Sequence, residues 1–174
     1  GHGLVYTQLE GKHGFEIARS YARANQEALD RMLGWIDAEG IDCDLERRSN
    51  YVYSDSPENI DQLEKEVDAA RRVGLDASLA REVDLPYDVA GAVVMEDQAQ
   101  FHPRKYLAAF AKHVDGDGSY IFENSRVTSL REDDPCEVET SSGRVVARDV
   151  ILATHYPFWD RGLLFPRVHP YRSY

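Results

Sequence analysis

The sequence is poor in cysteine and has no long apolar run. Cys43 and Cys136 are its only two cysteines, and they lie far apart in the chain. This excludes a disulfide scaffold and a CxxC metal site, so we expect two buried free thiols. No segment approaches the about 20 apolar residues that span a bilayer. The N-terminus also lacks a basic, apolar signal peptide, which makes the cytoplasm the expected compartment.

Basic residues are also few. The 174 residues include 31 acidic and 20 basic side chains, a net charge of -11. Basic side chains occur at most in pairs, as at Arg47 and Arg48, so the chain lacks the patch that binds nucleic acid. Residues 1–87 carry 18 acids and 10 bases (-8), and residues 88–174 carry 13 acids and 10 bases (-3). The second half is therefore the better place for an anionic ligand.

Several catalytic and ligand-binding motifs are missing. The chain contains no Walker loop, no GxSxG elbow, no HExxH pair and no GxGxxG fingerprint. Its six histidines never fall into metal-ligand spacing with carboxylates. The segment from Asp115 to Ser119 has Tyr120 where a calcium loop needs glycine, so it indicates a turn. We expect no metal site.

The first two thirds of the chain have a helical pattern. With 43% apolar residues the chain can bury a core, and at about 150 residues per domain its length suggests one domain. Apolar residues at spacings of three and four predict long helices, and runs rich in Val and Tyr predict strands. The expected elements are helices over 14–39, 56–72 and from 103 onward, strands over 45–53 and 91–95, and a short helical turn over 78–81.

The last third has the pattern of short strands, expected over 120–123, 126–131, 136–140, 145–147 and 149–154. Ser141-Ser142-Gly143 predicts a hairpin turn. The apolar run from Val150 to Ala153 is typical of a strand buried on both faces of a parallel sheet. The fold class predicted from these patterns is α+β, with helices and a mixed, largely antiparallel sheet.

Four segments occur in an informative order: 97–107 with a proline-started helix, 124–130, the hairpin ending at Gly143 to Ala147, and 149–154. Together they resemble FAD-dependent oxidoreductases of the D-amino-acid oxidase type, which include glycine oxidase and sarcosine oxidase. The resemblance covers 91–158 with good order and spacing and 3–87 with weaker motifs. His2-Gly3-Leu4 resembles the segment that follows the family's flavin-proximal loop.

The resemblance implies a cofactor site. A strand inside a sheet can offer backbone N–H and C=O groups to the edge of an adenine ring. The strand position that does so in the family corresponds to Val127 in this sequence. Ala153 and Thr154 correspond to the small residues that let FAD approach closely. His155 stands where the family has glycine; it either packs beside the cofactor or is a strand-end histidine that faces solvent.

The resemblance also implies substrate-lining positions at His2, Gln100 and Phe101, although a strand-end phenylalanine is more often a core residue. It assigns no catalytic residue. The implied domains are a substrate-domain portion over 1–102, a partial Rossmann-like FAD-binding portion over 103–158, and a return segment over 159–174.

Two functions remain open at this stage. In the first, the chain is an internal fragment of an FAD-dependent oxidoreductase that oxidises an amine or amino acid by hydride transfer. Three parts of the family's FAD site are missing from this sequence: the GxGxxG fingerprint, the acidic residue that binds the ribose, and the C-terminal glycine-rich segment. The fragment would then be inactive and hold FAD weakly or not at all. Its His-Gly-Leu and ATHYP segments are similar to those of family members that are fused to a Rieske domain. The Cys and His ligands of such a domain are absent from this sequence.

In the second, the chain is a non-enzymatic acidic α+β module that binds a basic partner.

Overall fold

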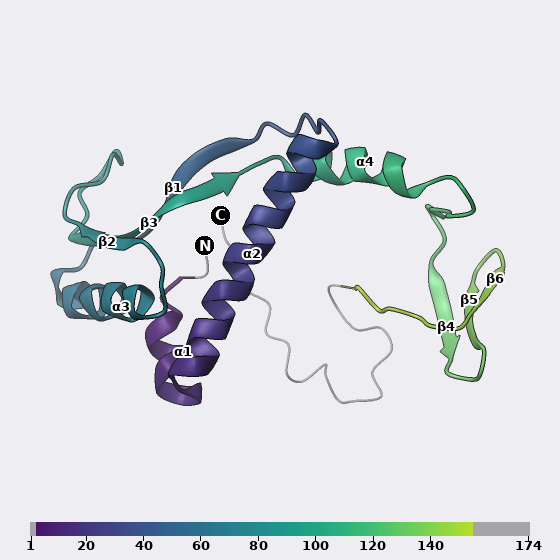
Figure 1. Ribbon diagram of the computed structural model, residues 1–174, viewed down its shortest axis with the longest axis horizontal. Coiled ribbons are helices and arrows are strands. Elements are labelled where there is room, and N and C mark those ends of the chain that lie inside the picture. The colour runs from purple at the N-terminus through teal and green to yellow at the C-terminus, as the bar shows by residue number, and fades with distance from the viewer. Residues whose placement is uncertain (1–2, 155–174) are drawn as a thin grey trace. The chain divides into compact units, whose positions relative to one another are not determined.

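The computed structural model describes residues 3–154 and has the expected α+β character, with helices and two small antiparallel sheets (Figure 1). The chain divides into two compact units, residues 1–117 and residues 118–174. No helix in the described range is long and apolar enough to cross a membrane.

The first unit contains four helices and three strands. In chain order these are α1 (Tyr6–His13), α2 (Phe15–Ala38), β1 (Glu46–Ser54), the 3-10 turn η1 (Pro57–Asn59), α3 (Ile60–Arg72), β2 (Ala77–Ala80), β3 (Gly91–Gln100) and α4 (Pro103–Val114). The predicted helices over 14–39, 56–72 and from 103 are confirmed. Helix α1 was not predicted, because only Tyr6 of its eight residues is buried and its apolar pattern is weak. Gly14, with a φ of 85°, separates α1 from α2.

The three strands form an antiparallel sheet in the order β1-β3-β2, with β3 in the centre. The helical turn predicted over 78–81 is wrong: Ala77 to Ala80 pair with Met95 to Ala92, so this segment is a strand. Strand β3 is longer than the predicted 91–95, because β1 pairs with it as far as Gln100 through a bulge next to Arg48. Arg47 donates to the carbonyl of Asp97 at 2.5 Å beside this bulge.

Helix α3 packs against one face of the sheet. Leu63 and Val67 of α3 form a buried cluster with Val93 of β3. Gly91 lies close to both α3 and β2, since a Cβ there would lie 3.0 Å from Ile60 Cδ1 and 3.3 Å from the Ala80 carbonyl oxygen. A glycine at the start of β3 therefore permits this close packing.

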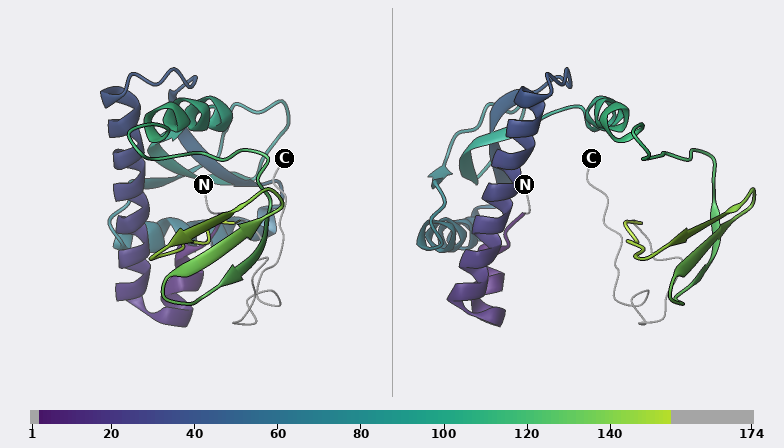
Figure 2. Two further views of the ribbon diagram at one scale, coloured as in Figure 1. Left: turned by 90° about the vertical axis from the view of Figure 1, so that its right-hand side faces the viewer. Right: turned by 45° about the vertical axis from the view of Figure 1, so that its right-hand side comes forward.

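Helix α2 extends from α1 at one end to α4 at the other (Figures 1 and 2). Near its C-terminal end, Ile36 packs with Cys43 and Tyr106 in a second buried cluster. Cys43 is buried as predicted, although it lies in a loop, whereas Cys136 is only half-buried. Both cysteines are free thiols. The expectation of two buried thiols is therefore right for Cys43 and wrong for Cys136, because Cys136 lies in a small sheet with little to cover it.

A buried carboxylate joins α3 to the start of α1. Glu66 is 1% exposed and is the only buried charged residue in the described range. Its Oε1 accepts from the Tyr6 backbone N–H at 2.6 Å and its Oε2 accepts from the Thr7 N–H at 2.9 Å. These are two of the N–H groups that lack partners at a helix start, and the helix dipole favours a negative charge there. Glu66 thus caps α1 from a position 60 residues away.

The second unit contains the antiparallel strands β4 (Val127–Arg131), β5 (Cys136–Thr140) and β6 (Arg144–Ala147), in that order across the sheet. These strands and the turn at Ser141 to Gly143 agree with the sequence-based prediction. Residues 120–123 and 149–154 are not strands, contrary to expectation. In the described range neither segment has a neighbouring strand to pair with, and a strand needs that partner.

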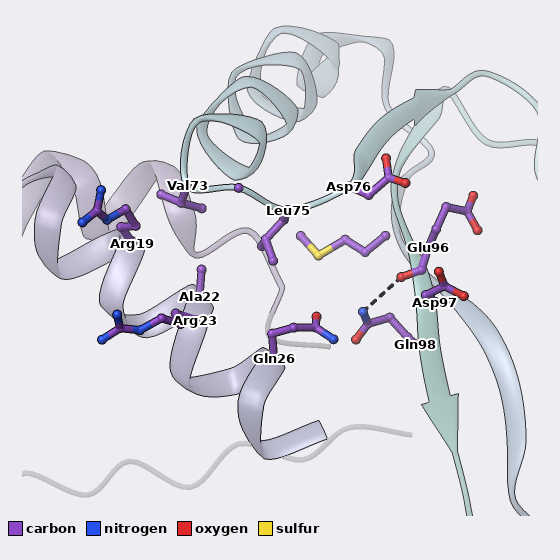
Figure 3. A pocket seen from close by; sticks show the side chains of 12 residues that line it. Arg19, Ala22, Arg23, Gln26, Val73, Leu75, Asp76, Glu96, Asp97 and Gln98 are labelled. Atoms are coloured by element: carbon purple, nitrogen blue, oxygen red, sulfur yellow. Dashed lines mark hydrogen bonds between the residues drawn. The ribbon is translucent and has the colours of Figure 1, made fainter. Parts of the chain in front are cut away.

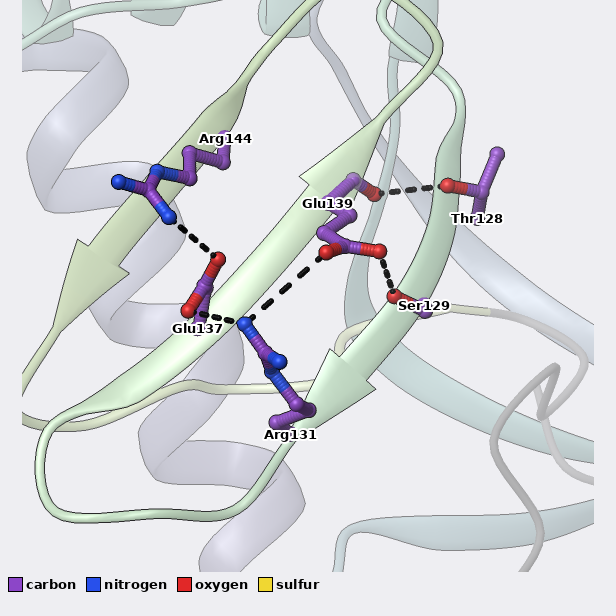
Figure 4. Close-up of polar contacts among 6 residues, drawn as sticks. All are labelled: Thr128, Ser129, Arg131, Glu137, Glu139 and Arg144. Atoms are coloured by element: carbon purple, nitrogen blue, oxygen red, sulfur yellow. Dashed lines mark hydrogen bonds and ion pairs between the residues drawn. The ribbon is translucent and has the colours of Figure 1, made fainter.

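Charged side chains connect the three strands on one face of this sheet (Figure 4). Glu137 on β5 pairs with Arg131 of β4 and with Arg144 of β6, the latter at 3.2 Å. The hydrogen bond from Arg131 is the main reason that the pKa of Glu137 lies below its usual range. Ser129 donates to Glu139 at 2.6 Å. These cross-strand contacts favour the observed register.

Removing the Glu66 carboxylate should destabilise the first unit. Glu66→Ala leaves the Tyr6 and Thr7 N–H groups without their acceptor in a buried place, so we expect the free energy of unfolding to fall by about 2–4 kcal/mol. Glu64→Ala is the matched control, because Glu64 lies on the same helix and makes only an exposed ion pair, with Arg81 at 2.9 Å, so its loss should change stability by no more than about 1 kcal/mol. Urea unfolding measures both. Equal effects of the two substitutions would contradict the capping role.

Tyr6 should make stability fall at high pH. Burial, with smaller contributions from Tyr21 and Glu66, raises the pKa of the Tyr6 phenol from 10.0 to about 12. The folded state therefore favours the neutral phenol. This contribution to stability is complete below pH 10 and is lost as the pH rises through about 12. In urea unfolding across this window the wild type should lose more stability than Tyr6→Phe. Parallel losses would show that Tyr6 titrates normally.

Candidate functional site

Val127, the expected adenine position, is the first residue of β4 and is half-buried. Strand β4 lies at the edge of its sheet, with β5 on one side and no described strand on the other. In an edge strand every second residue directs its N–H and C=O away from the neighbouring strand. The edge of β4 can thus present backbone donors and acceptors to a planar heterocycle such as adenine. The backbone of this strand therefore fits the adenine part of FAD.

Ala153 and Thr154 lie beyond the last strand and are exposed. The expected doubly buried strand from Val150 to Ala153 is wrong in this chain, since Ile151 is 89% exposed. Both described sheets are antiparallel and neither reaches these residues. The role of Ala153 and Thr154 beside FAD therefore stays a prediction.

Gln100 and Phe101 lie together at the end of β3. With Asp44, Glu46 and His102 they line an open pocket of about 470 Å³. Gln100 donates to Glu46 at 2.9 Å. Phe101 packs against Tyr106, with ring centroids 5.3 Å apart, and so contributes to the second buried cluster as well as to the pocket. Phe101 is therefore a core residue that also borders this pocket, and its substrate-lining role stays a prediction.

The two carboxylates of this pocket are held in their charged form. A hydrogen bond from Lys105 at 2.6 Å lowers the pKa of Asp44. Hydrogen bonds from Arg48 and Gln100 lower the pKa of Glu46. Charged carboxylates beside an aromatic ring suit an ammonium group more than an anion.

The sequence-based candidates are distributed over separate parts of the chain. His2, His155 and the return segment over 159–174 lie outside the described residues. Val127, Ala153 and Thr154 belong to the second unit, and Gln100 and Phe101 belong to the first. Within residues 3–154, no three His, Cys, Asp or Glu side chains gather in a way that could hold a metal ion.

Sequence reasoning missed two features of the first unit. One is the Glu66 cap, whose partners lie too far away in sequence for a local capping pattern to reveal them. The other is a pocket between α2 and β3, lined by residues from three separate segments. The spacing of Arg19 and Arg23, one helical turn apart, could have shown that both lie on one face of α2. It could not have shown which residues lie opposite them.

Comparisons with known proteins give a consistent result. The sequence matches the family described as FAD dependent oxidoreductase (DAO) over residues 1–174. It is 31% identical over 175 residues to YhfW of Bacillus subtilis (strain 168), described as a Rieske 2Fe-2S iron-sulfur protein; the match covers 99% of this chain and 34% of that protein. It is 26% identical over 176 residues to gamma-glutamylputrescine oxidoreductase of Escherichia coli (strain K12), covering 87% of this chain and 41% of that protein.

Solved structures show the same fold. Glycine oxidase from Geobacillus kaustophilus aligns with a TM-score of 0.62 and 19% identity over 79% of this chain and 38% of that protein. Glycine oxidase from Bacillus cereus ATCC 14579 aligns with a TM-score of 0.57 and 21% identity over 75% of this chain and 38% of that protein. The chain thus spans between about a third and two fifths of the length of these relatives. Because the family match extends over the whole sequence, the chain belongs to the DAO family of FAD-dependent oxidoreductases.

Proposed function

We propose that this chain is part of a longer FAD-dependent oxidoreductase that oxidises an amine or an amino acid. The observation that carries the proposal is the family match over all 174 residues, together with a span of only 34% to 41% of two curated relatives. Bound FAD would supply the redox chemistry by accepting a hydride from the substrate carbon. The protein would supply binding, orientation and exclusion of water.

The two sides of such a site divide along the chain. Residues 1–102 would contribute to the substrate domain, 103–158 to the FAD-binding domain, and 159–174 would return toward the substrate domain. The division into one unit that holds β1, β2 and β3 and a second that holds β4, β5 and β6 supports this assignment. Helix α4 belongs to the first unit, so this helix would be the connection between the two portions.

On the cofactor side, backbone groups at Val127 would bind the adenine edge. The edge of β4 that no described strand occupies supports this role, since no side chain is needed there. Ala153 and Thr154 would let FAD approach the backbone, and His155 would lie beside it. No glycine-rich loop is present to hold the phosphates, so this chain alone would bind FAD weakly or not at all.

On the substrate side, Gln100 and Phe101 would line the binding pocket, with His2 as a further candidate. The charged carboxylates of Asp44 and Glu46 beside them support a substrate that carries an ammonium group. The relatives' names agree with this class, because they include a gamma-glutamylputrescine oxidoreductase and two glycine oxidases.

The likeness to YhfW supports a further proposal, that the longer protein also carries a Rieske-type domain. A Rieske centre needs two cysteines and two histidines as ligands to one cluster. Residues 3–154 contain no such group. The cluster would therefore be held by another part of the longer protein.

The 174-residue chain with excess FAD should show no flavin-dependent oxidation of amines or amino acids. The reason is that the phosphates of FAD would lack a helix N-terminus with a glycine loop. Hydrogen peroxide release and reduction of an artificial acceptor, measured over a panel of amines and amino acids, test this. Measurable turnover would mean that the chain contains a complete active site.

A longer form, extended at both ends to the length of the relatives, should be yellow and show flavin absorption bands. If the Rieske proposal is right, the same preparation should also contain iron and acid-labile sulfide. A colourless, well-folded longer form would contradict the proposed function. A yellow form without iron would contradict only the Rieske proposal.

A further inference from the structure

A pocket of about 560 Å³ lies in the first unit, between α2, the turn that follows α3, and β3 (Figure 3). It shares no residue with the pocket at Gln100 and Phe101. Its floor is apolar: Ala22 is 1% exposed, and Leu75 and the thioether of Met95 are half-buried. An aliphatic chain could pack against this floor without losing hydrogen bonds.

The two walls carry opposite charges. Arg19 and Arg23 line the side formed by α2, and Asp76, Glu96 and Asp97 line the side formed by the turn and β3 (Figure 3). An anion alone would be attracted to one wall and repelled by the three carboxylates of the other. A cation alone would meet the two guanidinium groups. A molecule with both charges matches both walls.

The arginines can be recruited at little cost. Their guanidinium groups now pair along their own helix, Arg19 with Glu16 at 3.2 Å and Arg23 with Glu27 at 3.6 Å. Their side chains are 58% and 74% exposed. Exposed pairs of this kind contribute about 0–1 kcal/mol, so a bound carboxylate can compete for either group.

The opposite wall has acceptors available. Within residues 3–154 the Asp76 carboxylate makes no hydrogen bond or ion pair, and it is exposed. Glu96 accepts one hydrogen bond, from Ser49, through Oε2. Its Oε1 remains available to an ammonium group.

Two amides extend toward each other across the pocket, Gln26 from α2 and Gln98 from β3 (Figure 3). The Nε2 of Gln26 donates to Asp30 at 3.3 Å, and the Nε2 of Gln98 donates to the Glu96 carbonyl at 3.1 Å. With their N–H groups used in this way, both side chains can offer their carbonyl oxygens. These oxygens are further acceptors for the N–H groups of a ligand.

We propose that this pocket binds a small zwitterion with an aliphatic spacer, of the ω-amino acid class. Its carboxylate pairs with Arg19 and Arg23, and its ammonium group is held by Asp76 and Glu96. The methylene groups of its spacer pack against the apolar floor at Met95. The inference uses no residue of the proposed FAD site and does not depend on the oxidase activity.

The chain offers a direct probe, because it contains only two methionines, Met32 and Met95. Met95 lines this pocket and Met32 does not. In the 174-residue chain labelled with ¹³C at the methionine methyl groups, titration with 5-aminopentanoate should move the Met95 resonance in a saturable way and leave Met32 unchanged. Pentylamine and pentanoate, which carry one charge each, should bind at least about tenfold more weakly. An unmoved Met95, or equal binding of a singly charged compound, would overturn the proposal.

Charge variants test each wall separately. Asp76→Asn with Glu96→Gln, and Arg19→Gln with Arg23→Gln, should each weaken 5-aminopentanoate binding about tenfold or more. Asp68→Asn on α3 and Arg31→Gln on α2 are matched controls, since both residues are exposed and lie outside the pocket. All these positions are exposed, so the variants should fold, and dispersed methyl resonances would verify it. Wild-type affinity in either double variant would contradict the assigned wall.

Discussion

The buried carboxylate of Glu66 is the interaction on which the helices of the first unit depend. Burying a charge without partners is costly, so this side chain fixes its surroundings: whatever packs there must supply hydrogen-bond donors. The start of α1 supplies two, at 2.6 and 2.9 Å. With α1 held against α3, Tyr6, Ala18 and Ala70 can form one buried cluster that also brings in α2. The cap therefore also fixes where α1 begins, directly after the segment that resembles the one following the family's flavin-proximal loop.

The second unit is organised differently. Among its described residues, 118–154, no charged side chain is buried, and its register follows from antiparallel pairing and from Glu137 between two arginines. Several of its apolar side chains are exposed, among them Val146 at 55% and Ile151 at 89%. Exposed apolar residues next to an open strand edge support the proposal that this unit works as part of a longer protein.

Local patterns were sufficient where an element's own residues determine it. Helix α2 has a strong apolar stripe, and Pro103 begins α4. Apolar and polar residues alternate in the sequence of β5, and the strand has the bounds predicted from it. Failures occurred where a distant partner decides the structure. Ala77 to Ala80 is a strand because β3 lies beside it, and Val150 to Ala153 is not a strand because no described strand does.

The candidate site followed the same rule. The resemblance named Gln100 and Phe101, and the structure shows them lining one pocket. The charged residues of that pocket are Asp44, in the loop before β1, and Glu46, the first residue of β1, so no local motif around Gln100 could have revealed them. The opposed charges between α2 and β3 likewise become visible only when three segments are brought together.

The central claim is that this chain contributes the adenine side of an FAD site through the backbone of β4. The most direct test is a crystal structure of the longer form with FAD bound. The account predicts that the adenine ring lies at the open edge of β4, with hydrogen bonds to the main chain at Val127 and with Ala153 and Thr154 against the cofactor. An adenine bound elsewhere, with the edge of β4 covered by another strand, would contradict it.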